Sequence, residues 1–91
     1  MAYSVIIPNH AKKQLQDIPP EKASRILDAI EGFSENLDYV RYDVRKVKGS
    51  PKRYPRYRLR SGEYRAILFI HHNKLILEVL SVVRKQGGMD Y

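Results

Sequence analysis

Arginine is the residue type in this sequence whose spacing could do chemistry. Arg56, Arg58 and Arg60 alternate with other residues, and Arg65 follows them after a Ser61-Gly62 turn signal. The rigid fork of a guanidinium binds two phosphate oxygens at once and can stabilise negative charge that develops in a transition state. The pattern therefore predicts a phosphate site. A surface sheet covered by long basic side chains is the plainer alternative.

The turn signal predicts a β-hairpin that brings the arginines together. If Ser61-Gly62 is its two-residue loop, Arg58 lies directly opposite Arg65. Alternation then places the four arginines at positions 56, 58, 60 and 65, with Ile67 and Phe69, on one exposed face. The intervening tyrosines and aliphatic residues lie on the other face. Like charges directly opposite each other destabilise a sheet unless an anion lies between them. We therefore expect the exposed face to bind phosphate.

Basic side chains are concentrated in residues 41–65, called here the basic segment. It has ten basic and two acidic side chains, a net charge of +8, whereas the whole chain of 91 residues has a net charge of +7. Such clustering indicates a polyanionic partner. A basic surface kept for solubility is the alternative.

Several classes of site and location are disfavoured by what the sequence lacks. It has no cysteine, and no Asp, Glu or His cluster has the spacing of metal ligands. His71 and His72 are adjacent at a predicted strand end, so they point to opposite faces. No apolar run approaches a membrane span, and the N-terminus does not resemble a signal peptide. We expect a cytoplasmic protein with no membrane contact, no metal and no cofactor.

The periodicity of the sequence predicts the elements that position these residues. In chain order it indicates a strand over 3–7, a short helix from about residue 10 and a second helix from about 20 to 36. A loop with many basic residues and a short strand or turn follows over 37–55. Three strands then follow over 56–60, 63–71 and 75–83. Val40, Val44 and Val47 are the expected core anchors of the loop. This order predicts an α+β fold, with an N-terminal strand, a helical hairpin and a three-stranded antiparallel meander. The helices cover one face of a small sheet in a single domain over 1–91.

With these elements the sequence resembles the RelE/ParE superfamily of bacterial and archaeal toxins, and most closely its RelE branch of ribosome-dependent mRNA endonucleases. The resemblance covers nearly the whole chain. It rests on Val47-Lys48-Gly49 before the sheet, on the run 57–65, on Val82-Val83-Arg84-Lys85 and on the late Tyr91. Gly62 followed by Tyr64-Arg65 is its most characteristic piece, and ParE-like gyrase poisons share it.

The resemblance implies roles for the arginines. Arg65 would contact the scissile phosphate, and Arg56 and Arg58 correspond to two basic residues of the preceding strand. Many family members have lysine at those two positions, and an arginine is not expected to deprotonate at neutral pH. The general base therefore stays open between Lys52, Lys85, Tyr91, a histidine and no discrete base at all.

The resemblance also implies roles near the end of the chain. Lys85 or Arg84 would protonate the leaving oxygen, and Tyr91 would stack on a base. The implied reaction is attack of an RNA 2′-hydroxyl on the neighbouring phosphate, without metal, to give a 2′,3′-cyclic phosphate. Further basic residues are expected to bind RNA, namely Lys46, Lys48, Lys52, Arg53 and Arg60.

The same resemblance implies the partners of the chain, which are mRNA on the ribosome and a cognate RelB-like antitoxin. Two other functions stay open. One is inhibition of DNA gyrase in the manner of ParE. The other is a catalytically decayed module that binds RNA or the antitoxin.

Overall fold

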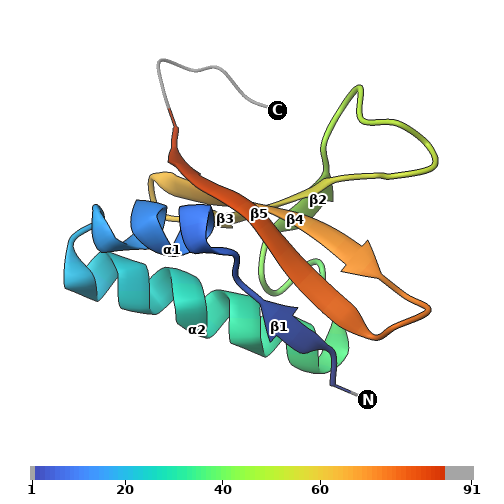
Figure 1. The fold of residues 1–91 in the computed structure, drawn as a ribbon, viewed down its shortest axis with the longest axis horizontal. Helices are drawn as coiled ribbons and strands as arrows, with labels where there is room; N and C mark the ends of the chain where they lie inside the picture. The colour runs from blue at the N-terminus through green and yellow to red at the C-terminus, as the bar shows by residue number, and fades with distance from the viewer. Residues whose placement is uncertain (1, 86–91) are drawn as a thin grey trace.

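The computed structural model, which describes residues 2–85, has a five-stranded sheet with both described helices on one of its faces (Figure 1). The elements are β1 Ser4–Ile6, α1 Asn9–Gln16, α2 Pro20–Asn36, β2 Val44–Lys46, β3 Tyr57–Ser61, β4 Tyr64–His71 and β5 Ile76–Arg84. The predicted α+β class and its layers are confirmed. The meander β3-β4-β5 is extended at its edges by β2, which is antiparallel to β3, and by β1, which is parallel to β5.

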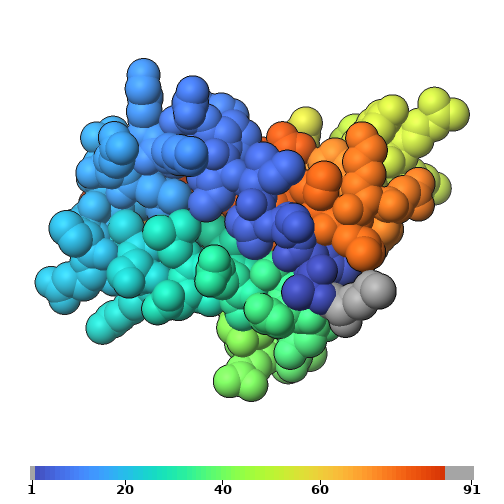
Figure 2. All heavy atoms as spheres, turned by 60° about the horizontal axis from the view of Figure 1, so that its bottom comes forward, coloured from blue at the N-terminus to red at the C-terminus, as the bar shows by residue number. Residues whose placement is uncertain are grey.

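The helices cover the sheet because their apolar stripes match its inner face. α1 packs mainly on β5, and α2 packs on β3 and β1. In Figure 2 the two helices lie side by side over the near side of the molecule. Ile26, Ile30 and Phe33 of α2 are fully or almost fully buried. The other face of the sheet, called here the outer face, carries no helix (Figure 1).

The connection from α2 to β2 is packed by aromatic rings and not by all three of the expected valines. Val44 is buried, but Val40 is 92% exposed, so the prediction that it anchors the core is wrong. Tyr39 and Tyr42, on either side of Val40, pack edge-on against Phe33 instead. Val40 lies in a turn between the two rings and therefore points away from the core.

The β3–β4 hairpin has the predicted faces but a different register. Ser61 pairs with Tyr64, so the loop is Gly62-Glu63 and not Ser61-Gly62. Gly62 has a φ of 59°, and a glycine with positive φ at the first loop position is what a type II′ turn requires. Arg58 therefore lies opposite Ile67, and its predicted position opposite Arg65 is wrong.

A β-bulge in β5 changes which side chains reach the outer face. Ile67 pairs with Ser81 but Leu68 pairs with Val79, so Leu80 is the extra residue. Helix α1 satisfies the backbone groups that the bulge frees: the His10 ring bonds the Leu80 carbonyl, and the Gln14 side chain accepts the Val82 N–H at 2.7 Å. The bulge shifts the alternation of β5 by one residue, so Val83 shares a face with Arg65.

Removing the Gln14 acceptor should destabilise this bulge. In Gln14→Leu the partly buried Val82 N–H loses its partner, which should lower the free energy of unfolding by about 1–3 kcal/mol. Urea denaturation measures the loss, and hydrogen exchange should show faster exchange at Val82. Gln16→Leu, at an exposed position of the same helix, is the matched control. Equal stabilities of the two variants would contradict this role of Gln14.

The connection from β2 to β3 is a closed loop, called here the basic loop (residues 47–56). Its ends are joined by the Val47 N–H, which donates to the Arg56 carbonyl at 2.7 Å. The Ser50 hydroxyl donates to the Val47 carbonyl, and Gly49 has a φ of 85° in the turn between them. The loop projects on the side of the sheet away from the helices (Figure 1). Its cations therefore lie beside the outer face.

Candidate functional site

Two adjacent cross-strand rows place arginines on the outer face. In one row Arg60 lies directly opposite Arg65, followed by Val83 of β5. In the next row Arg45 of β2 lies opposite Arg58, followed by Ile67 and Ser81. The four side chains, Arg45, Arg58, Arg60 and Arg65, are called here the arginine cluster. Arg45 was not among the predicted site residues, because the two-residue register shift and the pairing of β2 are not visible in the local sequence pattern.

Two of the four arginines in the cluster, Arg58 and Arg65, are buried, although the sequence predicted that this face is exposed. Arg58 is 3% exposed and Arg65 is 1% exposed. Both have partners within the folded chain. Burying charged groups costs free energy even when they are paired, and well-packed apolar residues often serve stability as well or better. Two adjacent buried guanidiniums therefore favour a role in binding or chemistry over a role in stability alone.

An aspartate joins the exposed members of the arginine cluster. The Asp43 carboxylate lies 3.8 Å from the Arg45 Nε and 3.6 Å from the Arg60 Nε. The Asp43 carbonyl accepts the Arg60 N–H at 3.2 Å, and Asp43 has a φ of 51°, which aspartate tolerates better than most residues. Asp43 thus orients the two exposed arginines of the cluster, Arg45 and Arg60. An acidic residue within a basic stretch was the only sequence signal for this role.

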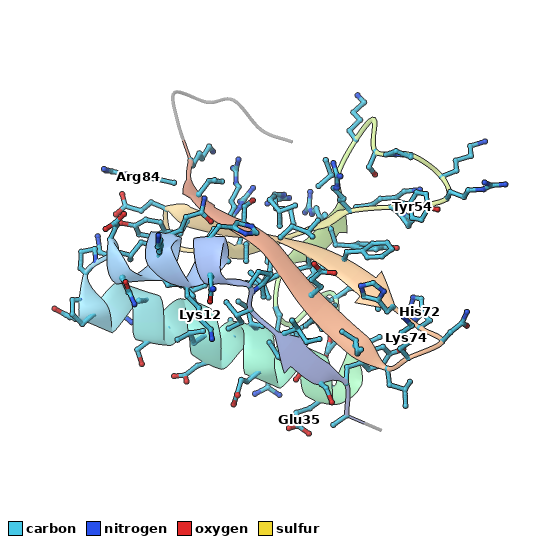
Figure 3. The ribbon with its side chains drawn as sticks, in the orientation of Figure 1. Lys12, Glu35, Tyr54, His72, Lys74 and Arg84 are labelled. Carbon is cyan, nitrogen blue, oxygen red and sulfur yellow. The ribbon has the colours of Figure 1, made fainter. Side chains whose placement is uncertain are left out.

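Arg84 and Lys85, which the sequence left as alternatives, differ in their contacts at the end of β5. Arg84 pairs with Tyr64 on the helix side of the sheet, where its guanidinium lies 3.0 Å from the Glu63 carboxylate. Figure 3 labels Arg84 at this end of β5. Lys85 is the next residue, and its backbone N–H donates to the Glu63 carbonyl at 2.7 Å. Lys85 lies one residue past the end of β5, and continued alternation from Val83 would direct its exposed side chain toward the face that carries Arg65.

Glu63 ties this end of the sheet to α2 through an exposed ion pair. The Lys22 Nζ donates to the Glu63 carboxylate at 2.6 Å. This hydrogen bond, followed by the charge of Arg84, holds the pKa of Glu63 below its ordinary value, and Glu63 raises the pKa of Lys22. A lowered carboxyl pKa stabilises the fold above the pKa of the unfolded chain, about 4.3 for glutamate. That stabilisation is lost as the pH falls through the folded-state pKa.

The contribution of Glu63 should therefore depend on pH. Glu63→Gln should melt at a slightly lower temperature than the parent chain at pH 7, because exposed ion pairs contribute little. The difference should shrink as the pH falls below about 4. Melting curves at pH 7 and pH 3 measure it, with Glu35→Gln on the exposed side of α2 as control (Figure 3). A difference that persists unchanged at pH 3 would rule out the ion pair as its cause.

The other predicted site residues divide into three groups. Arg56, Lys48, Lys52 and Arg53 are exposed in the basic loop, beside the outer face. Lys46 pairs with Tyr57, which places it on the helix side of the sheet and apart from the arginine cluster. Tyr91 lies outside the described residues.

Next to the arginine cluster the outer face carries rings, called here the aromatic platform (Tyr54, Phe69 and His71). The rings of Phe69 and His71 are nearly perpendicular, with centroids 4.5 Å apart. The ring centroid of Tyr54, in the basic loop, lies 6.1 Å from that of Phe69. Figure 3 shows Tyr54 on the loop beside the sheet. The His71 Nε2 bonds the Glu78 carboxylate at 2.9 Å. Phe69 is on this face as expected from the sequence, but the platform itself is not predictable from strand alternation, because Tyr54 reaches it from a loop.

The described residues show neither a membrane span nor a metal centre. No helix within residues 2–85 is long and apolar enough to cross a membrane. Within the same range no group of three or more His, Cys, Asp or Glu could hold a metal ion.

The chain has relatives in sequence and in structure among RelE toxins. No protein-family model matches it. A curated protein of Methanocaldococcus jannaschii that carries the name of a RelE toxin is 26% identical over 89 residues, which are 97% of this chain and 96% of that protein. The archaeal RelE–RelB complex from Pyrococcus horikoshii matches with a TM-score of 0.78 and 26% identity, over 98% of this chain and 100% of the matched chain. The E. coli RelBE toxin–antitoxin complex matches with a TM-score of 0.73 and 20% identity, over 94% of this chain and 100% of the matched chain.

The fold and the outer face together define a class, that of small α+β proteins with an arginine-rich, helix-free sheet face. In sequence and in fold the chain is similar to RelE toxins over nearly its whole length.

Proposed function

We propose that the chain is the toxin of a type II toxin–antitoxin system and acts as a ribosome-dependent mRNA endoribonuclease. The observation that carries the proposal is the pair of buried arginines, Arg58 and Arg65, on the outer face of a RelE-like fold. We expect Lys85, just past the end of β5, and the exposed cations of the basic loop to add positive charge at this face. This surface suits a phosphate whose charge increases during reaction.

In the proposed reaction the RNA supplies its own nucleophile. The 2′-hydroxyl oxygen forms a bond to phosphorus as the bond from phosphorus to the 5′ oxygen breaks, giving a 2′,3′-cyclic phosphate and a free 5′-hydroxyl. Arg65 and Arg58 stabilise the charge on the phosphate oxygens, and Lys85 donates a proton to the leaving 5′ oxygen. The proton of the 2′-hydroxyl passes to a general base or to solvent. The positive field of the cluster favours this step by stabilising the alkoxide.

Burial of Arg58 and Arg65 implies that the site opens when RNA binds. The exposed Arg45 and Arg60 meet the RNA first and bring its backbone to the outer face. Direct contact of a phosphate with Arg65 then requires that the groups covering this side chain move aside. In this proposal, binding of the ribosome-held mRNA supplies the free energy for this opening.

The proposed partners follow the same chemistry. The P. horikoshii and E. coli relatives were solved as complexes with RelB antitoxins. We propose that a RelB-like antitoxin holds this chain inactive, with acidic side chains complementing the basic segment. The proposed place of action is the cytoplasm, where ribosomes translate mRNA.

Cleavage of an mRNA in a purified translation system tests the proposal. Cuts that need both the chain and the ribosome, and that leave 5′-hydroxyl ends, are the expected result. If a folded chain cuts no mRNA but inhibits supercoiling by DNA gyrase, the ParE-like alternative replaces this one. If it does neither yet still binds RNA or antitoxin, it is a decayed binding module.

A further inference from the structure

We propose that the aromatic platform is a binding site for a nucleobase of single-stranded RNA, separate from the stacking role expected of Tyr91. The proposal rests on the proposed function in one respect only, that the ligand is RNA. It assigns a second part of the outer face, next to the arginine cluster, to base recognition.

Along β4 the side chains on the outer face change from mainly basic to aromatic and acidic. Arg65 and Ile67 belong to the rows that contain arginines, whereas Phe69 and His71 belong to rows with Glu78 and Ile76 of β5. Phe69 lies four positions after Arg65, which corresponds to about 13 Å along a strand. A strand of RNA whose phosphate lies at Arg65 can therefore reach the platform within a few nucleotides.

The carboxylate on the platform side favours a base over a phosphate. Glu78 lies on the outer face opposite Phe69 and would repel a phosphate placed there. Its hydrogen bond to the His71 Nε2 holds the imidazole ring in place, and the perpendicular contact with Phe69 packs that ring from the side. Rings that are already held in position lose little conformational entropy when a base stacks on them.

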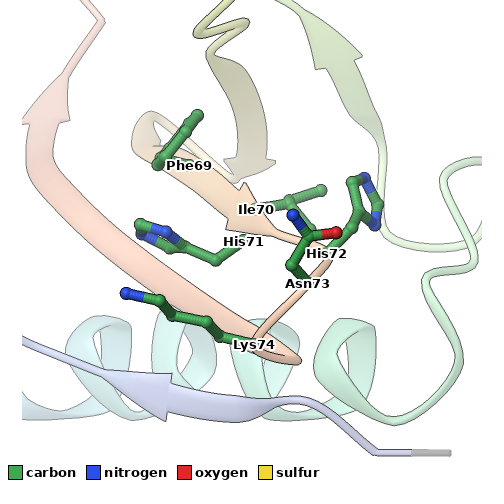
Figure 4. Close-up of a pocket in the computed structure, with 6 residues that line it drawn as sticks. All are labelled: Phe69, Ile70, His71, His72, Asn73 and Lys74. Atoms are coloured by element: carbon green, nitrogen blue, oxygen red, sulfur yellow. The ribbon is translucent and has the colours of Figure 1, made fainter.

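A pocket of about 360 Å³ opens beside these rings, at the turn between β4 and β5. Its lining runs from Phe69 to Lys74. Figure 4 shows that Phe69, His71 and Lys74 project to the same side of the turn, whereas His72 projects to the other. The volume lies within the range of small-molecule sites, about 300–1,000 Å³, and suits a single base. Lys74, with its positive charge, is placed to contact the phosphate of that nucleotide.

The basic loop provides the third ring and the link to the backbone of the RNA. Tyr54 is 58% exposed, so one side of its ring is open to solvent while the other approaches Phe69. Its neighbours in the loop, Lys52 and Arg53, are exposed cations. Aromatic rings interleaved with cations are the usual surface for single-stranded nucleic acid.

The test is binding of a hexaribonucleotide that carries 2′-O-methyl groups and so cannot be cleaved. Phe69→Leu keeps apolar volume but removes the stacking ring, and it should weaken binding about 5- to 20-fold at every salt concentration. Arg45→Ala is the matched contrast, because loss of a phosphate contact should reduce the slope of log affinity against log salt by about 0.7. Phe69→Leu should leave that slope unchanged. Melting curves check that both variants remain folded.

Aromatic NMR spectra of the parent chain complete the test. Ring signals of Phe69, His71 and Tyr54 that shift on addition of the RNA are the expected result. Backbone signals that shift at the arginine cluster while the ring signals stay unmoved would overturn the proposal, as would rings that respond only to the antitoxin. Binding through the rings without cleavage of mRNA on ribosomes would refute the proposed function and leave this inference standing. Absence of any binding to the hexaribonucleotide would overturn this inference alone, because the proposed function is decided by cleavage of mRNA on ribosomes.

Discussion

Replacing Arg65 by alanine should lower the rate of mRNA cleavage on ribosomes about 100- to 1,000-fold. Arg65 is the most buried of the four arginines and lies directly opposite Arg60, so it is expected to contact the phosphate once RNA binding has opened the site. The loss should appear mainly in kcat, because the other cations of the basic segment still bind the RNA. Single-turnover cleavage of a labelled mRNA in programmed ribosomes measures it.

Two further variants make this result interpretable. Arg25→Ala removes an arginine exposed on α2 and should leave the rate unchanged. Arg65→Lys keeps the charge but loses the planar fork, and it should recover only part of the rate. Since loss of a buried side chain also affects packing, the melting temperature of each variant is measured alongside. A folded Arg65→Ala chain that cleaves at the parent rate would remove Arg65 from the site.

Replacing Lys85 by alanine should lower the cleavage rate about 100- to 10,000-fold, the usual contribution of a general acid. Arg84→Ala, one residue earlier, should change the rate by only a few-fold. The reason is the β-bulge at Leu80, after which continued alternation would direct Lys85 toward the face of the arginine cluster, whereas Arg84 contacts Glu63 on the helix side. Cleavage assays on the two variants compare neighbouring cations of opposite orientation.

The pH dependence of the rate gives a second readout for Lys85. If Lys85 donates the proton, the high-pH limb of the parent profile should be absent in Lys85→Ala. Arg84→Ala should keep that limb. The opposite ranking, with Arg84→Ala the slower variant, would mean that β5 has no bulge in the active state.

Much of the fold could be predicted because its elements have strong periodic patterns. The stripe that ends at Phe33 defines α2, and Pro20 marks its beginning, as the structure confirms. The alternation of apolar and basic residues assigned Leu59 and Arg58 to opposite faces correctly. These features depend on neighbouring residues only, so a sequence is enough to predict them.

The register and the burial of the arginines could not be predicted, because they depend on contacts between distant residues. Moving Gly62 from the second to the first loop position shifts every cross-strand pair without changing the faces. The bulge at Leu80 lies in a continuous apolar run, and its partners His10 and Gln14 are about 70 residues away. Lys85 and Arg84 were therefore indistinguishable in the sequence.

Cleavage of two matched mRNAs on ribosomes tests the central claim most directly. The two are identical except that one carries a 2′-O-methyl group at the nucleotide where the parent chain cuts. The chain should cut the unmodified mRNA and leave the methylated one intact at that nucleotide, because the 2′-hydroxyl is the proposed nucleophile. Equal cutting of both, or no cutting of either by a folded chain, would contradict it.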